Sequence, residues 1–246
     1  MKNNFIITIP ARYNSTRLPG KPLKKIIGKA MIHHVWDICI KAVDKKNVVV
    51  LTDDHLIKDY CISNDINFFI ISKNCKTGSD RIYEFARIKK YKYYINVQGD
   101  EPLLNPKNIK EVIKFTKKYN CVTNCYSSCS ELEYKNINVP KVVLDNNDYL
   151  LFMSRAPIPF YKSNKIPKKI FKQICIYGYP YNYLMKFGKL KKKSKNELIE
   201  DIEIIRFLDI GIKIKMINVK NHSLAVDTPN DLRKVRKIFE DRYKKS

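Results

Sequence analysis

Short apolar runs alternate with amphipathic helical stretches along the first half of the chain. Residues 5–9, 48–51, 67–71 and 93–97 are runs of the length and apolar content expected of buried strands. Between the first two runs an apolar stripe recurs at helical spacing, formed by Ile32, Val35, Trp36, Cys39 and Val43. Strands that alternate with helices at this interval indicate βαβ units. The pattern therefore predicts an α/β fold with a mainly parallel sheet.

The pattern changes in the second half of the chain. Two extended runs, 141–144 and 149–153, flank a short polar turn of Asp and Asn, which is the signature of an antiparallel hairpin. A further strand is expected over 173–179. We therefore predict an antiparallel insertion over residues 137–180, lying beside the main sheet, inside a single domain that spans residues 1–246.

The last third of the chain offers one helix with acidic residues on one side. Glu197, Glu200 and Glu203 recur every three residues, and Arg206 follows three further on. A single helix ended by Gly211 is the simplest interpretation. The final helix is expected to begin after Thr228, which acts as its N-cap. The preceding residue, Asp227, is then expected to lie free at the end of a strand.

The chain is strongly basic, with a net charge of +24 at pH 7. Such a charge raises the alternative of a nucleic-acid-binding protein, which would bind DNA or RNA in a salt-dependent way and turn over no nucleotide. However, only nine of the 48 basic residues are arginine, and Asn, Ile and Tyr are frequent while Gly is scarce. A genome rich in A and T explains this composition, so we expect scattered lysines and no specific nucleic-acid partner.

Two further compositional features concern the compartment. The first apolar run ends at Pro10 and Arg12, and no run reaches the eighteen or so apolar residues that a membrane span requires. The seven cysteines suit a reducing compartment, so we expect a soluble cytoplasmic protein. Cys121, Cys125 and Cys129 share one side of a strand, where buried thiols are a better interpretation than a zinc site without a fourth ligand.

The loop after the first strand carries the strongest chemical signal. Arg12, Arg17 and Lys21 lie there with the hydroxyl of Ser15 and a turn at Gly20, where the chain can approach a ligand closely. Charge-assisted hydrogen bonds from such groups are what phosphate accepts, although an ordinary basic surface loop remains the alternative. The loop has neither of the common glycine fingerprints, G-x-G-x-x-G or G-x-x-x-x-G-K-[ST]. A Rossmann dinucleotide site and a Walker-type loop are therefore disfavoured.

Two carboxylates and one helix start complete the candidate site. Asp100 follows a predicted central strand and a glycine, where a carboxylate can hold a divalent cation, and Asp227 precedes the last helix. The residues 77–81 open another helix, whose N-terminus with Arg81 is interpreted either as a second anion site or as an ordinary cap. A phosphate-binding loop with two carboxylates favours metal-assisted nucleotidyl transfer over simple hydrolysis.

Seven stretches, in order over nearly the whole chain, resemble the 3-deoxy-manno-octulosonate (Kdo) cytidylyltransferase family. They are ARYNSTRLPGKPL at 11–23, TGSDR at 77–81, NVQGDEPL at 96–103, KVVLD at 141–145, SRAPIPF at 154–160, IYGY at 176–179 and VDTPNDL at 226–232. The resemblance implies a Rossmann-like nucleotidyltransferase fold with helices on both faces of the sheet. It implies Mg²⁺-dependent transfer of CMP from CTP to the anomeric hydroxyl of Kdo, with release of pyrophosphate, for lipopolysaccharide synthesis. It also implies a homodimer, with the insertion forming the sugar pocket and the interface.

The same resemblance assigns expected roles by motif. The residues expected to bind CTP are Ala11, Arg12, Ser15, Arg17 and Lys21, with Thr77, Gly78 and Ser79 near the cytosine. The residues expected to line the pocket of the acidic sugar are Arg81, Gln98, Arg155, Tyr177, Glu200 and Glu203. Those expected to act in catalysis are Lys21, Asp100 and Asp227, the two aspartates as Mg²⁺ ligands.

The departures from the family pattern concentrate in the sugar half. Lys172 and Gln173 stand where the family commonly has Arg-His, Ile204 stands where it commonly has Gln, and Ala225 replaces a usual glycine. The nucleotide and metal residues match well. Cytidylyl transfer to a related acidic sugar, either 8-amino-Kdo or one of the sialic acid type, is therefore the main alternative.

Overall fold

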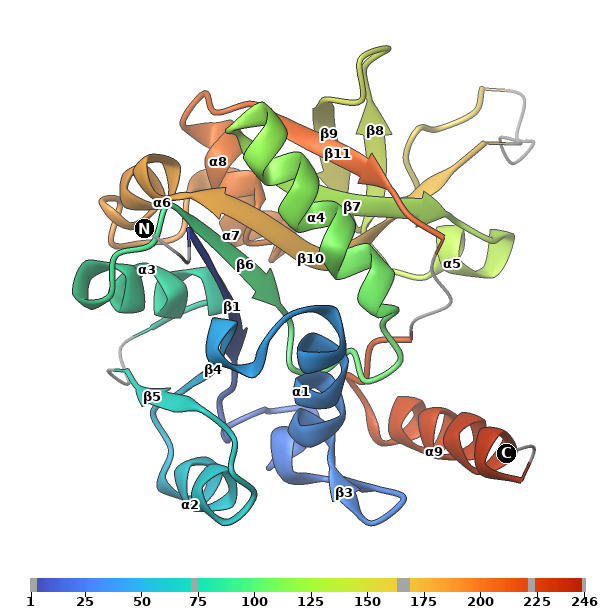
Figure 1. Ribbon diagram of the computed structural model, residues 1–246. Helices are drawn as coiled ribbons and strands as arrows, with labels where there is room; N and C mark the ends of the chain where they lie inside the picture. Colours follow the sequence, from blue (N-terminus) through green and yellow to red (C-terminus); the bar gives the residue numbers. More distant parts are fainter. Residues whose placement is uncertain (1–3, 72–74, 163–168, 221–223, 245–246) are drawn as a thin grey trace.

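A computed structural model describes residues 4–71, 75–162, 169–220 and 224–244. Its centre is a nine-stranded sheet, and Figure 1 shows the strands fanned across the molecule. Seven of the strands follow one another across the sheet in the order β11 (Ile214–Asn218), β7 (Val122–Ser128), β10 (Phe171–Pro180), β6 (Tyr93–Val97), β1 (Phe5–Pro10), β4 (Val48–Thr52) and β5 (Phe68–Ile70). The α/β architecture with a mainly parallel sheet is confirmed.

One of these seven strands runs against the other six. β1 pairs in parallel with both β4 and β6, and β7 with β11, whereas β10 is antiparallel to its neighbours β6 and β7. The prediction that the whole segment 137–180 lies beside the main sheet is therefore wrong for β10, which lies inside it. The tyrosines and isoleucines of β10 are buried on both faces, and a strand buried on both faces belongs in the interior of a sheet.

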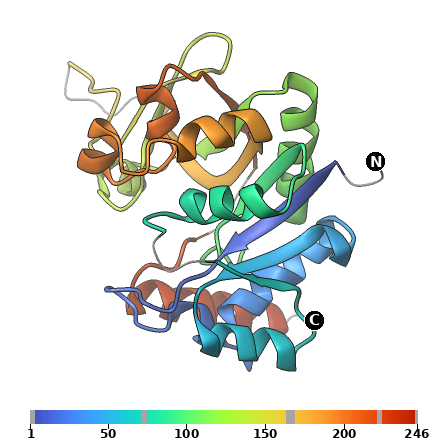
Figure 2. The ribbon, with the colours of Figure 1, turned by 90° about the vertical axis from the view of Figure 1, so that its left-hand side faces the viewer.

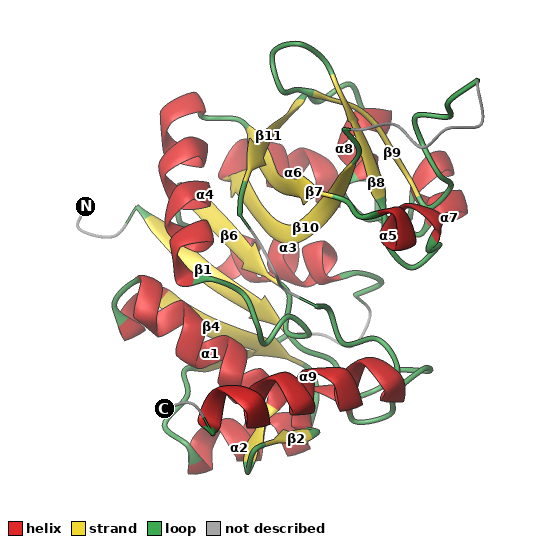
Figure 3. Cartoon of the chain, turned by 90° about the vertical axis from the view of Figure 1, so that its right-hand side faces the viewer, coloured by secondary structure: helices red, strands yellow, loops and turns green. Residues whose placement is uncertain are grey.

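The rest of the segment forms a hairpin at one end of the sheet. β8 (Lys141–Leu144) and β9 (Leu150–Ser154) pair antiparallel, and β8 also pairs with the start of β10. Asp145 closes the turn, because its side chain accepts hydrogen bonds from the backbone N–H groups of Asn147 and Tyr149. Figure 3 shows the hairpin near α5 (Glu131–Lys135), at the opposite end of the molecule from α9 (Pro229–Tyr243).

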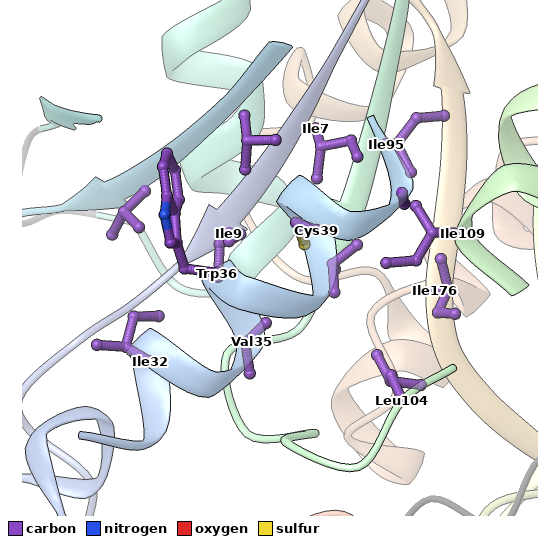
Figure 4. Packing of buried hydrophobic residues seen from close by; sticks show 14 of the residues in the cluster. Ile7, Ile9, Ile32, Val35, Trp36, Cys39, Ile95, Leu104, Ile109 and Ile176 are labelled. Carbon is purple, nitrogen blue, oxygen red and sulfur yellow. The ribbon is translucent and has the colours of Figure 1, made fainter. Parts of the chain in front are cut away.

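Helices cover both faces of the sheet. Figure 2 shows α1 (Met31–Ala42) and α3 (Gly78–Ile88) on opposite sides of β1. On the α1 face, Trp36 and Val35 pack with Ile7 and Ile9 of β1, and α4 (Pro106–Tyr119) adds Ile109 (Figure 4). On the other face, α3 packs with α6 (Tyr181–Gly188) and α8 (Ile205–Asp209). The burial of these apolar residues on the two faces holds the loops at the strand ends in place.

Side-chain caps begin three of the helices, and the start expected at Thr228 is confirmed. Asp54 caps α2 (His55–Ser63) by accepting from Leu56 N–H at 2.9 Å, and Asn105 caps α4 by accepting from Lys107 N–H at 3.0 Å. Thr228 and Asp231 form a reciprocal capping box at the start of α9. No helix in the described part of the chain has both the length and the apolar character needed to cross a membrane.

Two predictions about the last third of the chain are wrong. The single acidic helix is in fact two short helices, α7 (Lys195–Glu200) and α8, because the backbone turns left-handed at Asp201, where φ is +50°. Asp227 does not end a strand either. It lies in an extended segment without strand pairing, which is tied to the end of the β6 loop by a hydrogen bond from Val226 N–H to Asp100 C=O at 2.9 Å.

Candidate active site

A cavity of about 700 Å³ opens at the carboxyl ends of β1 and β6. Its walls come from the first loop, the start of α3, the loop after β6, the start of β10 and the segment before α9. All of the predicted site residues line this cavity except Ser79 and Glu200. The structure thus brings together side chains that are separated by up to about 200 positions in the sequence, at the sheet edge where open α/β folds bind ligands.

One half of the cavity, formed by the first loop with Asp100 and Asp227 and called the nucleotide half after its expected ligand, is organised around one ammonium group. Lys21 Nζ donates to Asp100 Oδ2 at 2.7 Å and to Asp227 Oδ1 at 3.2 Å, and Arg17 Nη2 donates to the same Asp227 oxygen at 3.1 Å. Both carboxylates accept from the same nitrogen, Lys21 Nζ. The distance between the two accepting oxygens therefore cannot exceed the sum of these two hydrogen-bond lengths. Gly20, at φ +67°, makes the turn that directs Lys21 toward them.

The protonation of Lys21 follows from these partners. Burial is the largest influence and by itself would lower the pKa of Lys21, but the charges of Asp100 and Asp227 and their hydrogen bonds outweigh it. The net result is a pKa raised above that of an ordinary lysine. Lys21 therefore stays a cation at neutral pH, which a group that faces phosphate requires.

The start of α3 is a cap rather than an open anion site. Thr77 and Asp80 form a capping box, and the Ser79 N–H donates to Glu203 Oε2 at 3.0 Å. Ser79 is fully buried, with its hydroxyl 2.8 Å from the Tyr179 hydroxyl. Ser79 does not line the cavity, so it supports the turn from behind, while Thr77 and Gly78 form the cavity wall. The Ser79 N–H, one of the groups at this helix start that the sequence suggested for an anion, already donates to Glu203.

Arg81 lies beside the first loop. Its side chain is nearly buried, its Nη2 lies 3.2 Å from Asp53 Oδ1, and its Nη1 has no hydrogen-bond partner among the described residues. With Arg12 and Asp53 it also lines a smaller adjoining cavity of about 240 Å³. The structure therefore groups Arg81 with the residues expected to bind the nucleotide, although the family resemblance implies a sugar contact.

The other half of the cavity, called the sugar half after its expected ligand, is formed by Arg155, the 136–140 turn and the start of β10. Its charged side chains have different partners. The Arg155 guanidinium donates to three backbone carbonyls, those of Glu200 at 2.7 Å, Asp201 at 3.0 Å and Ile137 at 3.2 Å. Glu200 faces away from the cavity, and its carboxylate accepts from Ser154 Oγ and from Arg155 N–H. Both residues therefore fix the wall of the cavity, and much of their hydrogen-bonding capacity is already used.

Glu203 and Gln98 lie where the two halves meet. Glu203 Oε1 accepts from Gln98 Nε2 at 2.9 Å and from Asn96 Nδ2 at 3.3 Å. Burial is the main influence on this carboxyl and raises the pKa of Glu203 above its usual value, against the lowering effect of the bond from Ser79 N–H. Tyr177 faces the same wall and accepts from Gln173 Nε2 at 3.2 Å.

The sequence did not predict the surroundings of three charged side chains. Lys172 pairs with Glu133 on the cavity wall. Arg206, expected to follow the glutamates on one side of a helix, is fully buried between Glu197 and Asp80, with contacts of 2.6 Å to each. The third is Lys141, which is buried at the start of β8. The only available signal for Lys141 was a lysine that opens an apolar strand inside the motif KVVLD, and strand alternation alone gives it no partner.

The carboxylates in the nucleotide half suit Mg²⁺. Asp100 and Asp227 offer hard oxygen ligands at one place, and Mg²⁺ in nucleotide sites takes one or two carboxylates together with phosphate oxygens and water. The described residues hold no cluster of three or more His, Cys, Asp or Glu side chains that could bind a metal without a nucleotide. Arg17 and Lys21 balance the two aspartates, so a triphosphate there needs further positive charge, which Arg12 and a divalent cation can supply.

Comparisons with known proteins agree on one family. A cytidylyltransferase family model matches residues 6–214. A 3-deoxy-manno-octulosonate cytidylyltransferase of Elusimicrobium minutum is 37% identical over 244 residues, which is 96% of this chain and 98% of that one. An 8-amino-3,8-dideoxy-manno-octulosonate cytidylyltransferase of Shewanella oneidensis is 35% identical over 238 residues, covering 94% and 96% of the two chains.

A solved structure matches the whole fold. It is that of a CMP:2-keto-3-deoxy-manno-octonic acid synthetase complexed with CTP, with a TM-score of 0.88 and 31% sequence identity. The match covers 98% of this chain and 100% of the other. The fold around the cavity is therefore shared with a protein that binds CTP.

Proposed function

The chain belongs to the family of 3-deoxy-manno-octulosonate cytidylyltransferases, and on that premise we propose that it transfers CMP from CTP to Kdo. The anomeric hydroxyl of the sugar attacks the α-phosphorus, the bond to the β-phosphate oxygen breaks, and pyrophosphate leaves. The observation that carries the proposal is the bonding of Lys21 to both Asp100 and Asp227 on one wall of a cavity large enough for nucleotide and sugar.

The nucleotide is held by the loop after β1 and the turn before α3. Arg12, Arg17 and Lys21 stabilise the triphosphate and the charge that develops on the departing pyrophosphate, with Ala11 and Ser15 as neutral contacts in the same loop. Thr77 and Gly78 take the cytosine side. A Cβ atom at position 78 would lie 3.0 Å from Pro10 Cγ and 3.2 Å from Gln98 Nε2, so only glycine leaves this turn undisturbed.

Asp100 and Asp227 are the proposed Mg²⁺ ligands. When bound, Mg²⁺ supplies positive charge to the phosphate oxygens and lowers the pKa of a hydroxyl that it contacts. The support for this assignment is the meeting of two carboxylates at one ammonium, next to the proposed triphosphate loop. Lys21 keeps the two carboxylates in place before the nucleotide binds.

The sugar half suits an acidic sugar. Arg155 retains N–H groups beyond the three that it donates to the backbone, and Gln98, Tyr177 and Glu203 offer hydrogen bonds to hydroxyls. One observation favours 8-amino-Kdo as a second candidate substrate: the carboxylate of Glu133 lies on this wall, and an ammonium group on the sugar could replace its Lys172 partner.

We propose a homodimer that forms through the hairpin side of the molecule. Among the described strands, β9 pairs only with β8, and its other edge is open beyond the bridge that Tyr149, directly before β9, forms with Lys215. Exposed apolar side chains surround that side, namely Leu151, Phe152, Phe160, Tyr161, Leu198 and Ile199. Exposed apolar patches of this kind mark protein interfaces. Sedimentation of the protein and of a Phe152→Glu variant tests the assignment, with a dimer expected for the first and a monomer for the second.

The proposed compartment is the cytoplasm. None of the seven cysteines, all of which lie in the described part of the chain, forms a disulfide, and a reducing compartment maintains thiols in this state.

Pyrophosphate release tests the proposed function. The assay supplies CTP and Mg²⁺ with Kdo, 8-amino-Kdo or sialic acid in parallel. We expect release that needs nucleotide, metal and an octulosonate sugar together, with Kdo turned over fastest. Faster turnover of 8-amino-Kdo would favour the second candidate, and absence of release with all three sugars would contradict the proposal.

A further inference from the structure

A fully buried lysine, Lys141, lies behind the sugar half of the cavity and is not one of the proposed site residues. Lys141 opens β8, and its Nζ donates to three backbone carbonyls, those of Asn136 at 2.9 Å, Val139 at 2.7 Å and Arg155 at 2.5 Å. An ammonium group has three N–H donors, so all of them are used. In the described part of the chain no carboxylate forms an ion pair with it. A buried cation held by carbonyls alone is unusual, because burial of charge without a counter-ion is costly.

The three acceptors belong to the wall that faces the proposed sugar. Asn136, Val139 and Arg155 all line the cavity, as does Asn138 between the first two. The Arg155 guanidinium donates to Ile137 C=O in the same turn. Lys141 and Arg155 together therefore bind the carbonyls of residues 136, 137 and 139. With these carbonyls directed inward toward the two cations, the side chains of the turn are left to face the cavity.

A second buried cation shows that this arrangement is distinctive. Arg206 is equally buried, but both ends of its guanidinium pair with the carboxylates of Glu197 and Asp80, and it lies over the Phe187 ring. That arrangement is an ordinary buried ion pair inside the core. Lys141 instead donates all three of its N–H groups to backbone carbonyls of two segments, the 136–139 turn and Arg155, which come together at the cavity.

We propose that Lys141 is a positioning residue for the sugar substrate. It sets the spacing between the 136–139 turn and Arg155, and so the width of the sugar half, without touching the substrate itself. The inference rests on the proposed cytidylyl transfer to an acidic sugar. It predicts that loss of the Lys141 ammonium weakens the use of the sugar selectively, because the nucleotide half shares none of these bonds.

Steady-state kinetics of a Lys141→Met variant test the proposal. We expect the KM for Kdo to rise about tenfold, which is the equivalent of one lost charged contact, while the KM for CTP stays within about twofold. A Lys141→Gln variant, which keeps two donors, should lie between wild type and Lys141→Met. The matched control is Lys215→Met: Lys215 is also largely buried and donates to the backbone of Asn147 at the other end of the hairpin, so both KM values should stay unchanged.

Hydrogen exchange of the unliganded variants separates this inference from the proposed function. In Lys141→Met, the amides of residues 136–139 and 155–156 should exchange faster than in wild type, with the remainder unchanged, and this holds even if wild type turns over no octulosonate sugar. Three outcomes would overturn the proposal: equal changes in both KM values, unchanged exchange in these segments, or failure of both Lys141 variants to fold. The first and third would mean that Lys141 stabilises the whole domain, and the second that it does not hold the cavity wall.

Discussion

The two halves of the cavity use the same kinds of charged side chain in opposite ways. In the nucleotide half, Lys21 and Arg17 bond to carboxylates that a cation and a triphosphate can take over. In the sugar half, Lys141 and Arg155 donate mainly to backbone carbonyls, which no ligand will displace. The first half is thus built to exchange partners during a reaction, whereas the second is built to keep one shape.

The largest effect should come from the carboxylates of the nucleotide half. We expect Asp100→Ala or Asp227→Ala to lower kcat roughly a hundred- to a thousandfold, by analogy with the loss of one contact that stabilises the transition state. Stopped-time assays of pyrophosphate release measure it. The matched control is Asp44→Ala, which removes a carboxylate from an exposed pair with Lys46 and should leave kcat unchanged. A near-normal rate in either test variant would remove that aspartate from the mechanism.

The next effect tests the fixed shape of the sugar half. Arg155→Met removes all three bonds to the carbonyls of Glu200, Asp201 and Ile137, so the KM for Kdo should rise about tenfold or more, with little change in the KM for CTP. Arg87→Met is the control, because Arg87 makes an exposed pair with Glu84, lies over the Tyr83 ring and does not line the cavity. Equal increases in the two KM values would mean that the halves are not independent.

A smaller effect on the KM for CTP is expected from Arg17, an exposed residue of the nucleotide half. Arg17 is half-exposed, and solvent weakens its contribution, so Arg17→Met should raise the KM for CTP about fivefold and leave that for Kdo unchanged. The control is Arg236→Met, another exposed arginine, which donates to the backbone of Lys25. A selective rise in the KM for Kdo instead would reverse the assignment of the two halves.

The smallest effect concerns the residue at the junction. Burial raises the pKa of Glu203 in the folded state, so the unfolded state ionises first as pH rises, and the folded protein loses stability at this carboxyl as pH rises above the usual glutamate pKa. A Glu203→Gln variant lacks this loss. The free energy of unfolding of the variant minus that of wild type should therefore increase as pH rises above the usual glutamate pKa. Urea titrations at several pH values measure it, and a flat or falling difference would contradict the account.

Local signals in the sequence were enough for much of this molecule. Asp54, Asn105 and Thr228 cap their helices as their sequence context predicts, because a cap depends on neighbours within four residues. The cavity residues in the loop after β1 were also predictable, since the end of a parallel strand is a place defined by the fold class.

Features that depend on distant partners could not be predicted. The placement of β10 inside the sheet depends on its pairing with β6 and β7, to which it is joined by no short connection. The break at Asp201 and the burial of Arg206 depend on partners in α3 and in the β9 loop. Lys141 is the clearest case, because a lysine that bonds only to backbone carbonyls needs no complementary residue type, so the sequence does not indicate its partners.

Manganese binding tests the central claim most directly, namely that two distant carboxylates hold one cation beside the triphosphate. Electron paramagnetic resonance of Mn²⁺ as a substitute for Mg²⁺ should show tight binding to wild type only after CTP is added. An Asp100→Asn/Asp227→Asn double variant, with the shape of both side chains retained, should lose that CTP-dependent binding. Equal Mn²⁺ affinity of the wild type and the double variant in the presence of CTP would contradict the account.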